Sequence, residues 1–173
     1  AVGNLAALRA FLSGWGTRGT SLTAQLDARL DTEKQDTLLT WAARHGQAEG
    51  VRRLMDAGAS VGATTGGGAS ALHIACQQGH VQCARLLLEA SAAVNQAAGG
   101  GFSPLRIASQ LGHLEIAQLL RDAGADINQA TQDGGTPLII ACQNERLEIA
   151  RLLLKAGASV NQATNIGVTP LFM

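Results

Sequence analysis

Histidine and cysteine are the residues of this sequence whose side chains most often do chemistry, as metal ligands, general bases or nucleophiles. The chain has three cysteines, an odd number, and none of them has the Cys-x-x-Cys spacing. This pattern argues against a disulfide framework and against a zinc site. Unpaired thiols are typical of a reducing compartment, so we expect a cytoplasmic protein. The residues concerned are His45, His73, His80, His113, Cys76, Cys83 and Cys142.

Two runs of glycine, residues 66–68 and 99–101, are further candidates because glycine-rich loops can bind phosphate. Neither run is followed by the Lys-Ser or Lys-Thr of a phosphate-binding loop, so we interpret both as turns. The sequence also has no Ser, His and Asp set, no paired carboxylates and no nucleophile elbow at a spacing that supports catalysis. We therefore expect no enzyme activity, no cofactor and no metal ion.

Composition and charge exclude other classes of function. The 173 residues include 13 basic and 13 acidic side chains, so no broad basic field is present to attract nucleic acid or an anionic membrane. No apolar run approaches the roughly 18 to 20 residues that span a bilayer, and the N-terminus lacks a secretory signal. The sequence is 46% hydrophobic but only 3% aromatic, which is typical of stacked short helices.

An internal repeat supplies the elements that would position any functional side chain. Each unit begins with Ser or Thr, and a leucine follows two residues later. The step between successive starts is 33 residues every time, and a period of this length indicates a repeat architecture. The starts are Thr37, Ser70, Ser103, Thr136 and Thr169, the last of which is cut off by the end of the chain.

Each unit predicts two helices. The Ser or Thr is a good N-cap, and the proline that follows it in three units suits the first helical position. About nine residues later Gly46, Gly79 or Gly112 permits the left-handed turn that ends the first helix. Apolar residues then recur at helical spacing, and a second glycine or a substitute for it ends the second helix. A short extended segment, such as residues 94–96, is expected before the glycine-rich turn.

This pattern resembles the ankyrin repeat, whose unit carries Gly-x-Thr-Pro-Leu-His-x-Ala, then Gly-His, Leu-Leu-Leu and Gly-Ala-x-Val-Asn. The resemblance covers residues 34–173. It implies an all-α fold, an ankyrin-repeat solenoid in which stacked antiparallel helix pairs are linked by β-hairpin-like loops. The repeats are then residues 34–66, 67–99, 100–132 and 133–165, and residues 166–173 begin a further, truncated repeat.

Residues 1–33 fit the pattern less closely. Leu5 aligns with Leu147, so we interpret this segment as the second helix of a truncated preceding repeat. An insertion around Gly16 to Ser21 would lengthen the hairpin that follows it. The alternative is an unrelated N-terminal capping helix. Because the chain starts at Ala1 and stops within the repeat pattern, we expect it to be part of a longer chain.

The resemblance implies a monomeric protein–protein interaction module, a scaffold that binds a partner protein through its concave face and hairpin tips. The alternative is a regulatory or substrate-recruiting segment of a larger enzyme or channel. The family's contact positions correspond here to Arg44, His45, Gln77, Gln78, Phe102, Gln110, Leu111, Gln132, Asp133, Gln143 and Asn144. The hairpin tips expected to project also include Glu33, Lys34, Asp36, Gly66, Gly67, Ala69, Gly99, Gly100 and Gly135.

Phe102 and Leu111 stand out among these positions because buried aromatic and aliphatic anchors dominate binding energy at interfaces. The alternative is that Phe102 folds onto its own hairpin and that Leu111 is an isolated surface residue. The resemblance assigns structural roles to His73, His80 and His113, and it leaves His45 at a variable position. All three cysteines fall at positions that other repeats fill with small or apolar residues, so we expect them to lie in the core.

Several departures from the pattern predict local weakness. Gly50 falls inside a second helix, where glycine costs roughly 1 kcal/mol relative to alanine. We therefore expect repeat 34–66 to be the least stable of the four. The leucines of residues 147–154 are expected to remain partly uncovered at the C-terminal end, as an apolar patch that a further repeat or a partner would cover.

Overall fold

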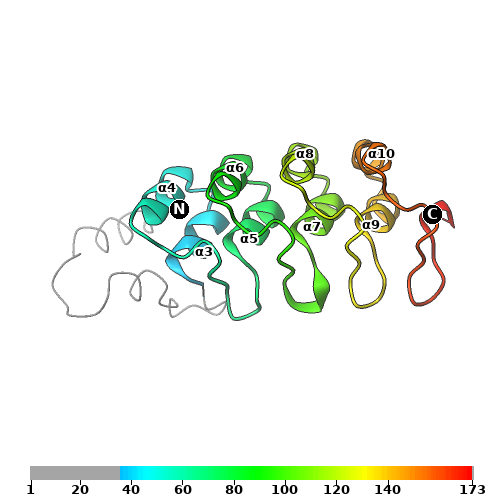
Figure 1. The fold of residues 1–173 in the computed structure, drawn as a ribbon, viewed down its shortest axis with the longest axis horizontal. Helices are drawn as coiled ribbons and strands as arrows, with labels where there is room; N and C mark the ends of the chain where they lie inside the picture. Colours follow the sequence, from blue (N-terminus) through cyan, green and yellow to red (C-terminus); the bar gives the residue numbers. More distant parts are fainter. Residues whose placement is uncertain (1–35, 173) are drawn as a thin grey trace.

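The computed structural model describes residues 36–172, and within them it contains eight α-helices and two short 3-10 helices. The α-helices form four pairs, each with an inner and an outer helix (Figure 1). The inner helices are α3 (Leu38–Arg44), α5 (Ala71–Gln78), α7 (Pro104–Leu111) and α9 (Pro137–Gln143). The outer helices are α4 (Ala48–Asp56), α6 (Val81–Glu89), α8 (Leu114–Asp122) and α10 (Leu147–Lys155). The 3-10 helices are η1 (Gly99–Gly101) and η2 (Pro170–Phe172).

The helix pairs stack side by side into an elongated array. Figure 1 shows the outer helices in one row, the inner helices in a second row and the connecting loops projecting on the side away from the outer helices. Each inner helix packs against its own outer helix and against the inner helix of the next repeat. The prediction of an all-α solenoid of stacked helix pairs is therefore confirmed. The interpretation of residues 1–33 lies outside the described residues.

Hydroxyl N-caps begin all four inner helices, as the sequence predicts. The side-chain oxygens of Thr37, Ser70, Ser103 and Thr136 accept hydrogen bonds from the backbone N–H three residues later, at 3.2 to 3.3 Å. These bonds satisfy one of the backbone donors that a helix leaves free at its first turn. The spacing of the caps therefore fixes the start of each inner helix.

A left-handed residue follows each inner helix and turns the chain into the outer helix. At the end of α5 this residue is Gly79, with φ 76°, and the imidazole of His113 from the next repeat lies against it. A Cβ atom at Gly79 would lie 2.9 Å from Cε1 of His113. In the last repeat Glu145 takes the same conformation, with φ 56°, which a non-glycine residue adopts at a cost.

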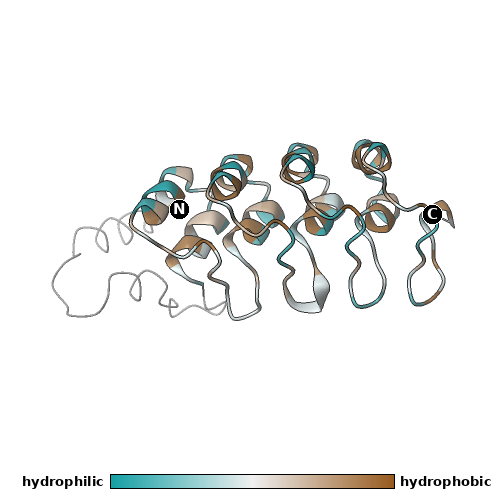
Figure 2. Ribbon diagram, in the orientation of Figure 1, coloured by the Kyte–Doolittle hydropathy of each residue, from teal (hydrophilic) through white to brown (hydrophobic). Residues whose placement is uncertain are grey.

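The core is built from the same positions of every repeat. An alanine within each inner helix and a leucine within each outer helix are fully buried in all four repeats, at 0% exposure. Figure 2 shows that each outer helix carries both hydrophilic and hydrophobic residues, as expected for a helix with one buried face. The core positions that the four repeats share are Ala42, Ala75, Ala108 and Ala141 with Leu54, Leu87, Leu120 and Leu153.

The segment expected to be extended before each hairpin instead contains a turn. Val94 and Asn95 form this turn, and the side-chain oxygen of Asn95 accepts a hydrogen bond from the backbone N–H of Asp126 at 2.8 Å. Asn128 binds the backbone N–H of Ser159 in the same way, also at 2.8 Å. The prediction of extended chain was therefore wrong, and the same turn occurs at residues 61–62, where glycine replaces the asparagine.

The hairpin-like loops are held by hydrogen bonds within each loop and by bonds between neighbouring loops. Two isolated bridges, Thr64 with Ser70 and Ala98 with Phe102, are the β-structure that the described residues contain. The backbone N–H of Gly99 donates to the carbonyl of Gly67 in the preceding loop at 3.2 Å. Both glycine runs are thus turns, as predicted.

None of the helices within residues 36–172 is both long enough and apolar enough to cross a bilayer.

Repeat 34–66 lacks one core side chain that the other repeats have. Gly50 of α4 takes the position where Cys83, Ile116 and Ile149 are buried, at 1%, 0% and 2% exposure. We therefore expect the amides of residues 39–56 to exchange with solvent faster than those of residues 138–155 in native-state hydrogen exchange. Equal protection of the two segments would contradict this prediction.

His73 predicts a loss of stability at acid pH. Its side chain is 5% exposed, and burial lowers its pKa below the ordinary value of 6.5. The unfolded chain therefore takes up a proton at a higher pH than the folded chain, so stability is lost as pH falls below 6.5. Urea unfolding between pH 7 and about 5 should show a smaller loss for His73→Gln than for the unmodified protein. Parallel pH profiles for the two proteins would exclude this role.

Candidate functional site

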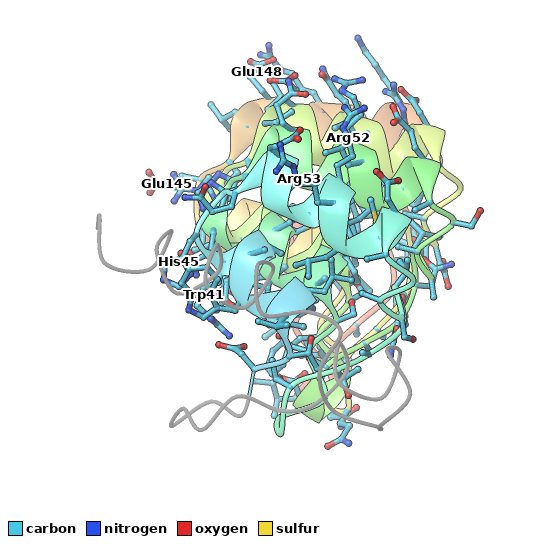
Figure 3. All side chains as sticks on the ribbon, turned by 90° about the vertical axis from the view of Figure 1, so that its left-hand side faces the viewer. Trp41, His45, Arg52, Arg53, Glu145 and Glu148 are labelled. Carbon is cyan, nitrogen blue, oxygen red and sulfur yellow. The ribbon has the colours of Figure 1, made fainter. Side chains whose placement is uncertain are left out.

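The residues at family contact positions line one side of the stack. They come from the C-terminal ends of the inner helices and from the loop tips, because positions 33 residues apart occupy equivalent places in each repeat. Figure 3, viewed along the stack, shows His45 and Trp41 of α3 on this side, whereas Arg52, Arg53 and Glu148 of the outer helices lie at the top. We call this side the inner surface. Its exposed members are His45, Gln77, Gln78, Phe102, Leu111, Gln132, Asp133 and Gln143, and Gln110 and Asn144 are half-buried.

Neutral amides dominate the inner surface between α5 and α9. Gln77, Gln78 and Gln143 are exposed, and the structure gives their side chains no hydrogen-bond partner within residues 36–172. Asn144 differs, because its side-chain N–H donates to the carbonyl of Ile140 at 2.9 Å. The free amides can each donate to and accept from a bound polypeptide.

The side chain of Arg44 is held in an ion pair, whereas the sequence predicted that it would be available to contact a partner. Its Nη2 and Nε atoms lie 2.7 and 3.0 Å from the two carboxylate oxygens of Asp36, in a bidentate ion pair. Asp36 was expected to project from a loop tip but is only 3% exposed. Asp36 is buried because its carboxylate, next to the N-cap Thr37, binds both Arg44 and the hydroxyl of Thr40, which donates at 3.3 Å.

His45 stacks on Trp41 at the N-terminal end of the inner surface. The two ring centroids lie 4.3 Å apart, and Nδ1 of His45 lies 2.9 Å from the carbonyl oxygen of Trp41. The contact holds an exposed imidazole in one orientation (Figure 3). The pair therefore presents a fixed aromatic edge to solvent.

Phe102 combines the two alternatives left open by the sequence. Its ring covers Gly100 of its own loop, where an added Cβ would lie 2.7 Å from Cε2 of the phenylalanine. The side chain nevertheless remains 38% exposed. The guanidinium of Arg106 lies over the ring, 4.4 Å from its centroid, which is the geometry of a cation–π contact. Phe102 is thus held in place without being removed from the surface.

Arg106 is a residue of this surface that the sequence reasoning missed. It occupies the position of Thr40, His73 and Ile139, which are all buried in the other repeats. The sequence does contain a signal for it, because Arg106 is a charged residue at a position that the other repeats fill with buried residues. The guanidinium Nη1 donates to the side-chain oxygen of Gln110 at 3.2 Å, so Phe102, Arg106 and Gln110 form one connected group.

Asp133 is fixed within its own loop tip. One carboxylate oxygen accepts hydrogen bonds from the hydroxyl of Thr131 and from the backbone N–H of Gly135, the latter at 3.4 Å. The bond from Thr131 is the largest cause of the lowered pKa of Asp133, and the backbone of Gly135 and the charge of Arg106 act in the same direction. Asp133 therefore carries a negative charge at neutral pH.

Leu111 borders a shallow groove that the sequence did not predict. The groove has a volume of about 380 Å³ and lies where the turn of repeat 100–132 meets the turn of repeat 133–165. Leu111 is 39% exposed and Leu147, on the other side of the groove, is 67% exposed. The remaining lining residues are Gly112, Leu114, Glu145, Arg146, Glu148 and Ile149.

The loop tips project in part as expected. Gly66, Gly67, Gly99 and Gly100 are exposed, but Ala69 is half-buried and Gly135 is buried. The prediction was wrong at Gly135, whose carbonyl accepts a hydrogen bond from the hydroxyl of Thr131 and whose N–H donates to Asp133 within the same loop. The expected projection of Glu33 and Lys34 lies outside the described residues.

The histidines and cysteines contribute to packing. Nε2 of His80 lies 3.2 Å from the carbonyl oxygen of Arg44 in the preceding repeat, a contact between repeats as expected. Cys76 and Cys83 are buried at 0% and 1% exposure, whereas Cys142 is only half-buried. Burial raises the pKa of all three thiols, which lowers their reactivity. Residues 36–172 contain no group of three side chains placed to hold a metal ion.

Comparison with known proteins identifies the repeat. No curated protein matches the chain significantly. The family described as ankyrin repeats (3 copies) matches residues 39–131 and 105–173, so the two matches together cover most of the chain. The period, the hydroxyl caps and the stacked helix pairs of the structure agree with this match. The chain therefore belongs to the ankyrin-repeat family.

Proposed function

We propose that this protein binds a partner protein through its inner surface. Ankyrin repeats are generally protein–protein interaction modules and are typically not enzymes. The observation that carries the proposal for this chain is the presence of two exposed apolar side chains, Phe102 at 38% and Leu111 at 39%, on a surface whose other exposed residues are mainly amides. Apolar anchors that are already ordered bind with a smaller entropy cost than mobile ones.

The amides around these anchors favour a partner that offers backbone polar groups. Gln77, Gln78 and Gln143 are exposed, and glutamine can pair with both the N–H and the C=O of a peptide. Such contacts surround the anchors with a polar rim, as in other protein interfaces. We further infer a monomer, and we infer a reducing, intracellular location from the three free cysteines.

Substitution of both anchors is expected to weaken partner binding. The change is Phe102→Ala with Leu111→Ala, and the expected loss is tenfold or more in affinity, since hot-spot side chains each contribute on the order of 1 to 2 kcal/mol. Proteins captured by the unmodified chain would be identified, purified and titrated against both chains by calorimetry. The matched control is Leu154→Ala, which removes an exposed leucine (47%) from outer helix α10. Equal affinities of the double variant and the unmodified protein would remove the proposed anchors.

A further inference from the structure

Arg106 is a buried cation that forms no ion pair among the residues that the structure describes. Its side chain is 8% exposed, and it forms no ion pair within residues 36–172, whereas Arg44 and five other arginines do. A buried charge is stable only when paired or hydrogen-bonded, because it loses its hydration. Burial accordingly lowers the pKa of Arg106, although the group stays charged at neutral pH. The buried guanidinium of Arg106 would therefore be stabilised by a negatively charged hydrogen-bond acceptor.

The hydrogen bonds of Arg106 leave most of its donors unused. A guanidinium carries five N–H donors, and the structure gives a partner to one nitrogen, Nη1, which donates to Gln110. Nε is buried and has no hydrogen-bond partner among the described residues. An unsatisfied buried donor of this kind calls for a missing acceptor.

The surrounding side chains fix the orientation of the guanidinium. Cζ of Arg106 lies over the ring of Phe102, 4.4 Å from its centroid, and Gln110 accepts a hydrogen bond from Nη1. The edge formed by Nε and Nη2 has no hydrogen-bond partner among the described residues, and two parallel N–H bonds along such an edge match a carboxylate. Both neighbours are themselves residues of the inner surface.

Asp133 does not serve as the acceptor for the unused donors of Arg106. It is the carboxylate whose charge acts on Arg106, but no ion pair joins the two, and one of its oxygens is held by Thr131 and Gly135. Its charge nearby makes the site suited to a single negative charge rather than to a doubly charged phosphate, which Asp133 would repel more strongly. The acceptor that fits is therefore a carboxylate.

We infer that Arg106 is a specificity-determining residue that binds a carboxylate of the partner, an Asp or Glu side chain, between Phe102 and Gln110. The inference rests on the proposed binding function and adds the chemistry of the partner. The partner segment must carry an acidic residue next to the apolar residue that meets Phe102. A partner with a neutral residue there leaves the guanidinium unpaired and binds more weakly.

Selection from a library of displayed random 12-residue peptides tests the inference. The unmodified chain should enrich peptides with Asp or Glu at one fixed position, and Arg106→Gln should lose that enrichment. The matched control is Arg121→Gln, at a half-buried arginine of outer helix α8, which should keep it. If Arg106→Gln does not fold, Arg106→Lys replaces it, and loss of two-pronged binding should then weaken acidic peptides without removing the preference.

A double-mutant cycle on the best peptide gives the quantitative result. Replacing its acidic residue by the matching amide should weaken binding to the unmodified chain tenfold or more and should have little effect on binding to Arg106→Gln. Asp133→Asn should tighten the acidic peptide, since it removes a competing charge. Equal losses on both chains would overturn the role of Arg106.

The same selection separates this inference from the proposed function. Peptides that bind Arg106→Gln as well as the unmodified chain, but fail to bind Phe102→Ala with Leu111→Ala, would leave the proposed function standing and overturn the inference. A selection in which no peptide depends on any inner-surface substitution would contradict both.

Discussion

Leu87→Ala is expected to lower the free energy of unfolding by about 2 to 5 kcal/mol. Leu87 is fully buried in α6, which packs against both α4 and α8 as well as against α5. Alanine would lose the burial of three carbon atoms and leave a cavity that neighbouring helices cannot fill without leaving their own positions. Urea unfolding followed by circular dichroism measures the loss.

Leu154→Ala is the matched control for this prediction. It removes the same atoms from outer helix α10, where the side chain is 47% exposed, so the expected loss is about 1 kcal/mol or less. Because each repeat is stabilised by its neighbours, Leu87→Ala should also speed amide exchange in α4 and α8. Similar losses for the two variants would mean that the buried leucines do not form a shared core.

Gly101→Ala is expected to destabilise the protein by about 1 to 3 kcal/mol. Gly101 has φ 83°, a conformation that favours glycine, and an added Cβ would lie 3.2 Å from the Cα atom of Thr131 in the next loop. The obstacle is backbone, which cannot rotate away as a side chain can. Since Phe102 follows directly, we also expect weaker partner binding, measured by the same titration as for the anchor variants.

Gly62→Ala supplies the contrast at a glycine in the turn that follows α4. No atom lies within 4 Å of a Cβ added at Gly62, and its φ lies outside the left-handed region. The substitution should leave stability unchanged or raise it by about 0.4 to 1 kcal/mol, because alanine restricts the unfolded chain. Equal destabilisation by both substitutions would show that loop geometry is not the cause.

The regular parts of the fold could be predicted because their causes are local. A hydroxyl residue followed two positions later by leucine begins an inner helix, and the structure places N-caps at Thr37, Ser70, Ser103 and Thr136. Glycine at Gly79 ends one inner helix for a reason that depends only on its own backbone. Repetition at a fixed period then specifies how one unit meets the next.

Contacts that join distant residues, or that depend on the direction of a side chain, were beyond the sequence. The bond from the backbone N–H of Asp126 to Asn95 joins two repeats, and the residues around Asn95 form a turn where an extended segment was expected. Within the first repeat, the pairing of Arg44 with Asp36 removed one predicted contact residue from the free surface. The cation–π contact of Arg106 with Phe102 likewise depends on side-chain directions that spacing alone does not specify.

We expect the inner surface, rather than the outer helices, to recognise the partner protein. Hydrogen exchange of the chain with and without its captured partner tests this most directly. Binding should slow exchange in residues 70–79, 99–112 and 132–144 and leave residues 114–122 and 147–155 unchanged. Slower exchange confined to α8 and α10, with the inner helices and loop tips unaffected, would contradict the claim.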